Sequence, residues 1–333
     1  MPQRNFLQYL LVTAKGLAMG AADVVPGVSG GTIAFISGIY EELIETIHNI
    51  DLGFFKIWKK EGFLSAWKHY NLSFLLALLS GIFISILSFA NIIIWLLNDY
   101  PIMVWSFFFG LVVASIVYVG QQINNWRLSI IIALVVASVL SYLITIINPV
   151  GSPDSTWFLF LAGFVAIIAM ILPGISGAFI LLLIGAYTTV IGYVTQLAEG
   201  ITTLNGSLFL GAFGKLFVFG MGCIVGIKMF SRVLNWMFKH HKNMTLAVLT
   251  GFMVGALNKI WPWKEVLEYR TNHAGEQIPL IERSILPSNF SGDPQILYAI
   301  LFAIIGFLTI FLLERIAVKK GSVKIENNPP TKL

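Results

Sequence analysis

The chain has 333 residues, of which 57% are hydrophobic and only 11% are charged, and its mean hydropathy is +0.84. Soluble globular domains are about 45–50% apolar and about 25% charged, so this composition excludes an ordinary soluble protein and a disordered one. The net charge of +5 does not indicate a nucleic-acid partner, because the Lys and Arg residues lie beside apolar segments, where they set topology. We expect a single membrane domain over residues 1–333.

Ten apolar segments follow one another along the chain. Six are long enough, at about 20 residues, to cross the hydrocarbon core as helices. These six begin at residues 71, 101, 128, 208, 244 and 295. The other four form two pairs, 6–22 with 26–40 and 157–172 with 173–197, and Pro-Gly interrupts each pair. Irregular backbone at membrane depth is tolerated only inside protein or beside water, so we interpret each pair as a re-entrant helical hairpin. Two tilted full spans are the alternative.

The two broken pairs share a sequence repeat. Residues 26–40, PGVSGGTIAFISGIY, align without a gap with residues 173–187, PGISGAFILLLIGAY, at an offset of 147 residues. A second block, which begins at Gly81 and Gly222, aligns at an offset of 141 residues. Each repeat would therefore contain one hairpin and three spans.

The repeats cover residues 6–147 and 157–316, and residues 317–333 form a predicted cytoplasmic tail. Three crossings are an odd number, so the second repeat must be inverted in the membrane. The predicted fold is thus an all-α polytopic membrane protein with two inverted repeats, the architecture of many secondary transporters.

The distribution of Lys and Arg predicts the orientation. If the N-terminus is cytoplasmic, 14 of these residues lie on the cytoplasmic side and 3 lie outside, as the positive-inside rule requires. The cytoplasmic set is Arg4, Lys56, Lys59, Lys60, Lys68, Arg127, Arg232, Lys239, Lys242, Arg315, Lys319, Lys320, Lys324 and Lys332, and the outer set is Lys264, Arg270 and Arg283. We therefore expect both termini to be cytoplasmic. Full spans in place of the hairpins would give the same result.

The repeated motif has the composition of an anion site. A helix that begins at each Pro-Gly leaves free N–H groups and partial positive charge at its first turn, and nearby hydroxyl groups can also donate. The predicted phosphate-binding residues are Pro26, Gly27, Ser29, Gly30, Gly31, Thr32, Pro173, Gly174, Ser176 and Gly177. Close packing of membrane helices on small residues is the alternative explanation.

Four ionisable residues extend the candidate site. Asp23 lies in the first apolar hairpin, where an acid marks function by default, so we expect it to couple transport to H⁺ or Na⁺. Lys15, Lys215 and Lys259 are candidate ligands for the phosphate. Their alternatives are a Lys15–Asp23 pair, snorkelling of Lys215 to the outer interface, and an interfacial anchor at Lys259.

The motifs resemble one known family. KGLAMGAADVVPGVSGGTIAFISGIYEELI (Lys15 to Ile44), ILPGISGAFILLLIGAY (Ile171 to Tyr187) and LTGFMVGALNKIWPW (Leu249 to Trp263) closely resemble the polyprenyl-phosphate transporter family, called PopT-like. This resemblance implies a protein of the bacterial or archaeal cytoplasmic membrane. It also implies that the protein returns undecaprenyl phosphate to the cytoplasmic leaflet, where cell-envelope synthesis reuses this lipid.

Two other functions remain open from the residues alone. A membrane polyprenyl-pyrophosphate phosphatase would need acid–base groups and a cationic clamp, but the second hairpin has no ionisable residue. A symporter of small soluble anions would have a similar anion site. Because no Walker, HExxH or cysteine-cluster motif occurs, we expect a transporter with no catalytic residue, no metal site and no cofactor.

Overall fold

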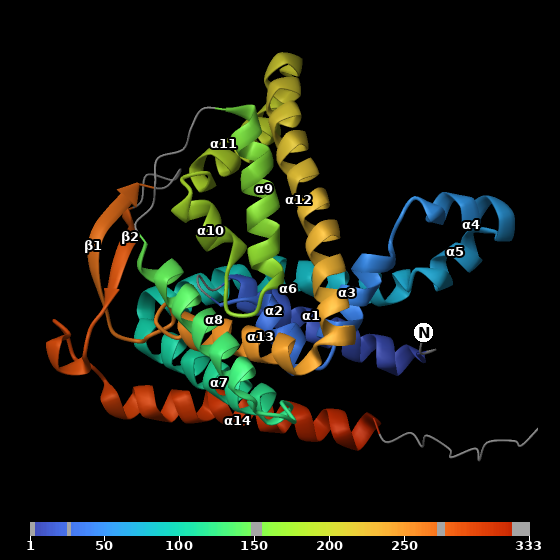
Figure 1. The fold of residues 1–333 in the computed structure, drawn as a ribbon. Helices are drawn as coiled ribbons and strands as arrows, with labels where there is room; N and C mark the ends of the chain where they lie inside the picture. The colour runs from blue at the N-terminus through green and yellow to red at the C-terminus, as the bar shows by residue number, and fades with distance from the viewer. Residues whose placement is uncertain (1–3, 25–27, 148–154, 272–276, 322–333) are drawn as a thin grey trace, which may run out of the picture.

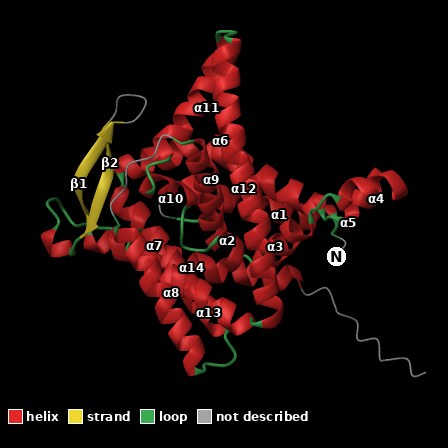
Figure 2. Ribbon diagram, turned by 45° about the horizontal axis from the view of Figure 1, so that its top comes forward, coloured by secondary structure: helices red, strands yellow, loops and turns green. Residues whose placement is uncertain are grey.

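The computed structural model describes residues 4–24, 28–147, 155–271 and 277–321 (Figure 1). Most of these residues are helical, and Figure 2 shows one small sheet at the side of the helical body. The helices are α1 (Phe6–Val24), α2 (Gly30–Ile36), α3 (Tyr40–Asn49), α4 (Gly53–Glu61), α5 (Phe63–His69), α6 (Leu72–Asp99), α7 (Pro101–Gln121), α8 (Leu128–Ile146), α9 (Thr156–Ile171), α10 (Gly177–Leu183), α11 (Tyr187–Thr202), α12 (Gly206–His240), α13 (Lys242–Ala256) and α14 (Ile296–Gly321).

Three to five elements of the described chain are long and apolar enough to cross a membrane. Helices α7, α8 and α12 qualify alone, while α5 with α6 and α10 with α11 qualify as pairs bent by 71° and 110°. The protein is therefore a multi-pass membrane protein. One predicted span is shorter than expected: α13 has 15 residues, because the chain after Ala256 forms hydrogen-bonded turns instead of more helix.

Glycines bring the long helices into close pairs. Helix α1 packs along α6, and α9 packs along α12, with backbone of the partner helix filling the space beside Gly16, Gly81, Gly163 and Gly222. A side chain at any of these positions would collide with that backbone, as in other membrane helix pairs built on small residues. Helix α7 packs on α14, and α8 packs on α13. Figure 1 shows α7 and α14 side by side below the upright pair α9 and α12.

The two aligned motifs adopt the same local structure. Helices α2 and α10 each have seven residues, and each follows an extended serine, Ser29 or Ser176. Each is followed by a glycine with positive φ, 72° at Gly38 and 74° at Gly185, a conformation that glycine adopts without steric cost. A tyrosine then begins the next helix in both halves. Within the described residues, each motif is thus a short helix that a glycine turn separates from the next helix.

The expectation of an all-α fold overlooked one element outside the helical body. Strands β1 (Lys264–Thr271) and β2 (Gln277–Ser284) form an antiparallel hairpin, followed by a short 3₁₀ helix (Pro287–Asn289). The strand signal was weak because the register shifts between Val266 and Tyr269, which interrupts the alternation of side chains. Figure 1 shows this β-hairpin and the helices α4 and α5 at opposite sides of the molecule.

Candidate functional site

The first turn of α2 lies against the turn between α9 and α10, so the two repeated motifs meet. The Gly174 N–H donates a hydrogen bond of 3.0 Å to Thr32 Oγ1, and Ser29 Oγ donates one of 3.4 Å to the Leu172 carbonyl. Ser29 and Thr32 are both buried. Residues separated by more than 140 positions in the sequence therefore form one polar cluster inside the protein.

A tyrosine strengthens this contact. Tyr40 is buried, and its hydroxyl donates a hydrogen bond of 3.0 Å to the Ile171 carbonyl. Sequence reasoning noted Tyr40 in the repeat but did not place it at the site. The sequence feature that could have indicated Tyr40 is the repeated Gly-x-Tyr, which places a tyrosine just after each short helix.

Helix α1 holds α2 at both of its ends. Asp23 Oδ1 accepts a hydrogen bond of 2.7 Å from the Gly30 N–H, and Lys15 Nζ donates one of 2.6 Å to the Ser37 carbonyl. A seven-residue helix is about 10 Å long, which separates these two contacts. An acid at the N-terminus and a cation at the C-terminus both complement the helix dipole. Lys15 and Asp23 therefore do not form the alternative pair, and Lys15 lies at the far end of α2 from the turn.

The first turn already has acceptors for two of its donors. Asp23 takes the Gly30 N–H, and Ser29 Oγ accepts a hydrogen bond of 3.1 Å from the Gly31 N–H as the N-cap. An external anion at this turn would have to displace the Asp23 carboxylate. Pro26 and Gly27 lie outside the described residues.

The start of α10, which we call the second turn, differs from the start of α2, which we call the first turn. Ser176 makes no side-chain capping bond to α10, although its backbone is as extended as that of Ser29. Pro173 is buried, and Gly174 has a φ of +87°. Gly177 faces the Ala166 carbonyl of α9 so closely that a side chain would not fit. The second motif therefore combines close packing with a serine hydroxyl that is not used to cap its helix.

Lys215 lies away from the turns, whereas Lys259 lies beside α10. Lys215 Nζ donates a hydrogen bond of 2.9 Å to Thr156 Oγ1 at the start of α9, and the turn follows the other end of this helix. A helix of this length spans about 24 Å, so Lys215 does not reach the turn. Lys259 follows α13 and binds Glu282 of β2 at 3.2 Å. Its ammonium also lies 4.8 Å from the ring centroid of Phe179 in α10.

Lys259 belongs to an ion cluster that sequence reasoning missed. Lys264 Nζ lies 3.7 Å from the same Glu282 oxygen and 3.4 Å from the ring centroid of Trp105. Burial lowers the pKa of Lys264 to about 8, although Glu282 opposes this shift. Burial alone would raise the pKa of Glu282, but Lys264 and Lys259 outweigh it and lower this pKa below its usual value. Only contacts between distant segments create the cluster, so the sequence carried no local signal for it.

Another lysine ties the two halves of the chain together. Lys228 of α12 donates hydrogen bonds to the carbonyls of Ile47 at 3.1 Å, His48 at 2.7 Å and Ile50. These carbonyls end α3, where a cation is favourable for the helix dipole. The two helices that follow the first turn, α2 and α3, therefore both end on a lysine from another helix.

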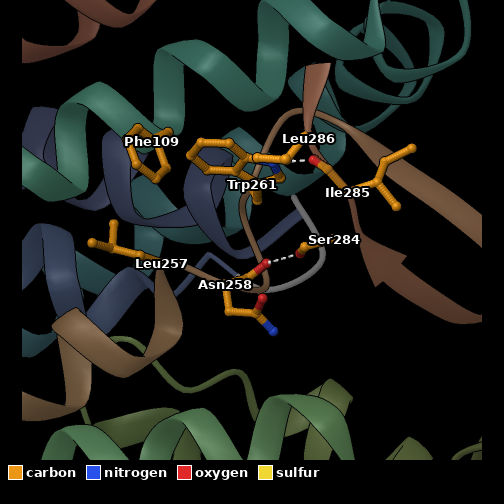
Figure 3. A pocket seen from close by; sticks show the side chains of 7 residues that line it. All are labelled: Phe109, Leu257, Asn258, Trp261, Ser284, Ile285 and Leu286. Atoms are coloured by element: carbon orange, nitrogen blue, oxygen red, sulfur yellow. Dashed lines mark hydrogen bonds between the residues drawn. The ribbon is translucent and has the colours of Figure 1, made fainter. Parts of the chain in front are cut away.

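Two of the cavities formed by the described residues lie near the helical body. The first, of about 380 Å³, opens at the base of the β-hairpin and is lined by Phe109, Leu257, Asn258, Trp261, Ser284, Ile285 and Leu286 (Figure 3). Its edge is fixed by hydrogen bonds of 2.8 Å from Trp261 Nε1 to the Ile285 carbonyl and of 2.9 Å from Ser284 Oγ to the Asn258 carbonyl. The second, of about 500 Å³, is a groove between α6, α7 and α14. Its lining is Ile93, Leu96, Tyr100, Met103, Val104, Phe107, Phe108, Phe302 and Ile305.

Comparison with known proteins identifies the family. The family described as "Undecaprenyl phosphate translocase-like" matches residues 19–278. A protein named "Polyprenyl-phosphate transporter" from Vibrio cholerae serotype O1 is 43% identical over 317 residues, which cover 94% of this chain and 98% of the relative. A protein of the same name from Staphylococcus aureus is 31% identical over 261 residues, which cover 74% and 84% respectively. No solved structure matches the chain. The relatives are named as transporters and not as enzymes, and the chain belongs to the undecaprenyl phosphate translocase-like family of membrane proteins.

Proposed function

We propose that this protein is a secondary transporter that returns undecaprenyl phosphate from the outer to the cytoplasmic leaflet of the cytoplasmic membrane. The observation that carries this proposal is the buried contact between the two repeated turns, which joins the halves of the chain through hydrogen bonds from Ser29 and to Thr32. The names of the two relatives support a polyprenyl phosphate as the substrate. Recycling of this lipid for cell-envelope synthesis follows from the direction of transport.

An inverted relation between the halves is part of the proposal. Helix α7, the second span of the first repeat, packs on α14, the third span of the second. Helix α8, the third span of the first repeat, packs on α13, the second span of the second. A pseudo-two-fold axis exchanges these two pairs, as in transporters built from inverted repeats. The re-entrant hairpins then meet near the axis.

The orientation follows from charge. Helices α4 and α5 carry lysines of the set that we place in the cytoplasm, and the β-hairpin belongs to the loop that we place outside. Their separation to opposite sides of the molecule supports this orientation (Figure 1). Both chain termini then lie in the cytoplasm.

The phosphate and Asp23 compete for the first turn. Both are anions, and the Gly30 N–H has room for one acceptor at hydrogen-bond distance. Two unit negative charges 4 Å apart repel by about 4 kcal/mol at an effective dielectric constant of ~20. Arrival of the phosphate therefore requires Asp23 to bind H⁺ or Na⁺, or to leave the helix end. This requirement is how we propose that an ion gradient drives the movement of the lipid.

The apolar groove between α6, α7 and α14 suits the isoprenoid tail. Its lining consists of aliphatic and aromatic residues, with Tyr100 at the end where α6 meets α7. An undecaprenyl chain is much larger than 500 Å³, so the groove would hold one section of the tail while the rest stays in lipid. Only the charged headgroup then needs a path through protein.

The test is leaflet-resolved transport of labelled undecaprenyl phosphate in proteoliposomes. The wild-type protein should move the lipid, and Ser29→Ala/Ser176→Ala should lower its affinity, because each lost hydroxyl bond to a charged group contributes about 1.5–3 kcal/mol. A stably folded double variant with unchanged affinity would show that the motif only packs helices. Uptake of a soluble anion without any lipid transport would favour an anion symporter, and release of phosphate from a polyprenyl pyrophosphate would favour a phosphatase.

A further inference from the structure

Two lysines converge on one carboxylate beside the β-hairpin. Glu282 Oε2 lies 3.2 Å from Lys259 Nζ and 3.7 Å from Lys264 Nζ. The three side chains come from the turn after α13 and from both strands, and they are 16%, 8% and 21% exposed for Lys259, Lys264 and Glu282. Because an ion pair this buried is screened little by salt or water, its charge balance matters for the fold.

This cluster has more positive charge than its carboxylate neutralises. Lys264 Nζ is buried and makes no hydrogen bond within the described part of the chain, although an ammonium group carries three donors. It lies 3.4 Å from the ring centroid of Trp105 and 3.7 Å from a Glu282 oxygen, which is beyond hydrogen-bond distance. Buried charges are normally paired and hydrogen-bonded, so the donors of this site exceed the acceptors that one carboxylate supplies.

A phosphate monoester would supply the negative charge and the hydrogen-bond acceptors that this cluster lacks. It carries a charge of about −1.5 to −2 at neutral pH and presents three acceptor oxygens, against one charge and two oxygens for Glu282. Two ammonium groups that converge on one point suit a tetrahedral anion, since lysine acts as a point charge without the fixed geometry of arginine. The aromatic ring of Trp105 would remain as the apolar wall of the site.

The position of the cluster connects it to both the outer loop and the second turn. Lys259 lies over Phe179, three residues after the Ser176 that precedes α10. Two residues that line the cavity in Figure 3 are close to the cluster in the sequence. Asn258 precedes Lys259, and Ser284 follows Glu282 by two residues along β2.

We propose that Lys259 and Lys264 form an anion site for the phosphate monoester headgroup of the lipid, and that Glu282 fills this site when no substrate is bound. The inference rests on the proposed function, since it makes this site the first binding point on the outer side. The headgroup replaces Glu282, which releases β2 from Lys259. Lys259 then links the bound headgroup to α10 and the second turn.

The experiment measures binding to the purified full-length protein in nanodiscs. The probes are inorganic phosphate and farnesyl phosphate, a short isoprenyl phosphate, which separate a free anion from a lipid headgroup. Glu282→Gln keeps the shape but removes the competing charge, so both probes should bind about tenfold more tightly or better. Lys264→Met and Lys259→Met should each weaken binding of the probes about tenfold or more. Lys264→Arg keeps the positive charge and should retain most of the wild-type affinity. Tighter binding of farnesyl phosphate than of phosphate would assign the site to the lipid.

The same hairpin supplies a matched control. Glu265 and Arg283 form an exposed ion pair of 2.7 Å, one residue away from Lys264 and Glu282 along their strands. Glu265→Gln removes a carboxylate from the same hairpin and should leave probe affinity unchanged. If Glu282→Gln binds no more tightly than Glu265→Gln, the cluster only holds the hairpin and the proposal is wrong. This measurement needs no lysine variant, so it stands even if Lys264→Met fails to fold.

Transport and binding separate the two proposals. If the wild-type protein moves the lipid but Glu282→Gln leaves binding unchanged, the outer anion site is refuted and the transport function stands. If the wild-type protein moves no lipid but Glu282→Gln tightens phosphate binding, the anion site stands and the transport function is refuted.

Discussion

The hydrogen bond from the Gly174 N–H to Thr32 Oγ1 gives the sharpest test of how the two turns are held together. Thr32→Val keeps a β-branched side chain of nearly the same volume but removes the acceptor. Thr32 is 1% exposed, and its partner is a backbone donor in a turn with positive φ. The substitution therefore leaves a partly buried N–H group without its acceptor, at a cost of about 1–3 kcal/mol.

Helix α13 offers a matched control. Thr250 is also buried, at 2% exposed, but its hydroxyl donates only to the Leu246 carbonyl of the same helix, at 2.7 Å. That carbonyl keeps its own helical N–H partner, so Thr250→Val leaves no donor or acceptor unpaired and should change stability little. The two substitutions are chemically identical, and they differ in whether the lost bond joins the two halves of the chain.

Thermal unfolding in detergent and lipid transport in proteoliposomes measure the two consequences. We expect Thr32→Val to unfold at a lower temperature than Thr250→Val and to transport undecaprenyl phosphate more slowly, because the turns lose their fixed separation. Equal unfolding temperatures and equal transport rates for the two variants would refute the idea that this bond positions the site.

Three further predictions follow from the contacts of charged residues. Asp23→Asn retains an oxygen that can accept the Gly30 N–H, so the protein should fold but lose transport driven by an ion gradient; normal transport with unchanged pH and Na⁺ dependence would contradict the coupling role. Lys15→Met should destabilise the fold by about 0.3–2 kcal/mol through the end of α2, without changing substrate affinity; a selective loss of affinity would instead make Lys15 a phosphate ligand. The folded pKa of Glu282 is below its ordinary value of 4.5, so its stabilisation is present above that pH and is lost as pH falls through the folded pKa. The protection of the β-hairpin amides from hydrogen exchange, expressed relative to the intrinsic exchange rate at each pH, should therefore fall on acidification in the wild-type protein, and Glu282→Gln should show the lower protection already at neutral pH.

The positions of the helices were predictable because hydrophobicity and Pro-Gly breaks are local signals. Each motif contains a short helix, but this helix begins at Gly30 or Gly177, three residues after the Pro-Gly where the motif indicated its start. The glycine with positive φ that follows each short helix lies at the same offset of 147 residues. Membrane segments are read well from sequence because their backbone must satisfy its own hydrogen bonds. This constraint says less about short helices such as α3, α4 and α5, whose boundaries depend on contacts with other elements.

The partners of the charged residues were not predictable. Lys15 and Asp23 are eight residues apart in α1, which spans about 12 Å and matches the length of α2 between them. Sequence reasoning considered an ion-coupling acid, a phosphate ligand and a direct pair of the two residues, and it missed a helix held between the two charges. Lys259 and Lys215 looked alike as lysines in apolar surroundings, yet one binds Glu282 and the other binds an exposed threonine. Only the tertiary fold decides between such partners.

Both candidate anion sites hold a carboxylate of the protein itself, and this has a consequence for transport. Asp23 accepts from Gly30 at the first turn, and Glu282 lies between Lys259 and Lys264 beside the β-hairpin. An empty site with unpaired donors would bind a phosphate too tightly to release it, and it would also be costly to bury. An internal carboxylate satisfies the donors between cycles and lowers the net affinity by competing with the substrate. Removal of either competitor should therefore tighten binding, and if release limits turnover, Glu282→Gln should bind the lipid more strongly and transport it more slowly. Faster transport by this variant would show instead that capture of the headgroup limits the cycle.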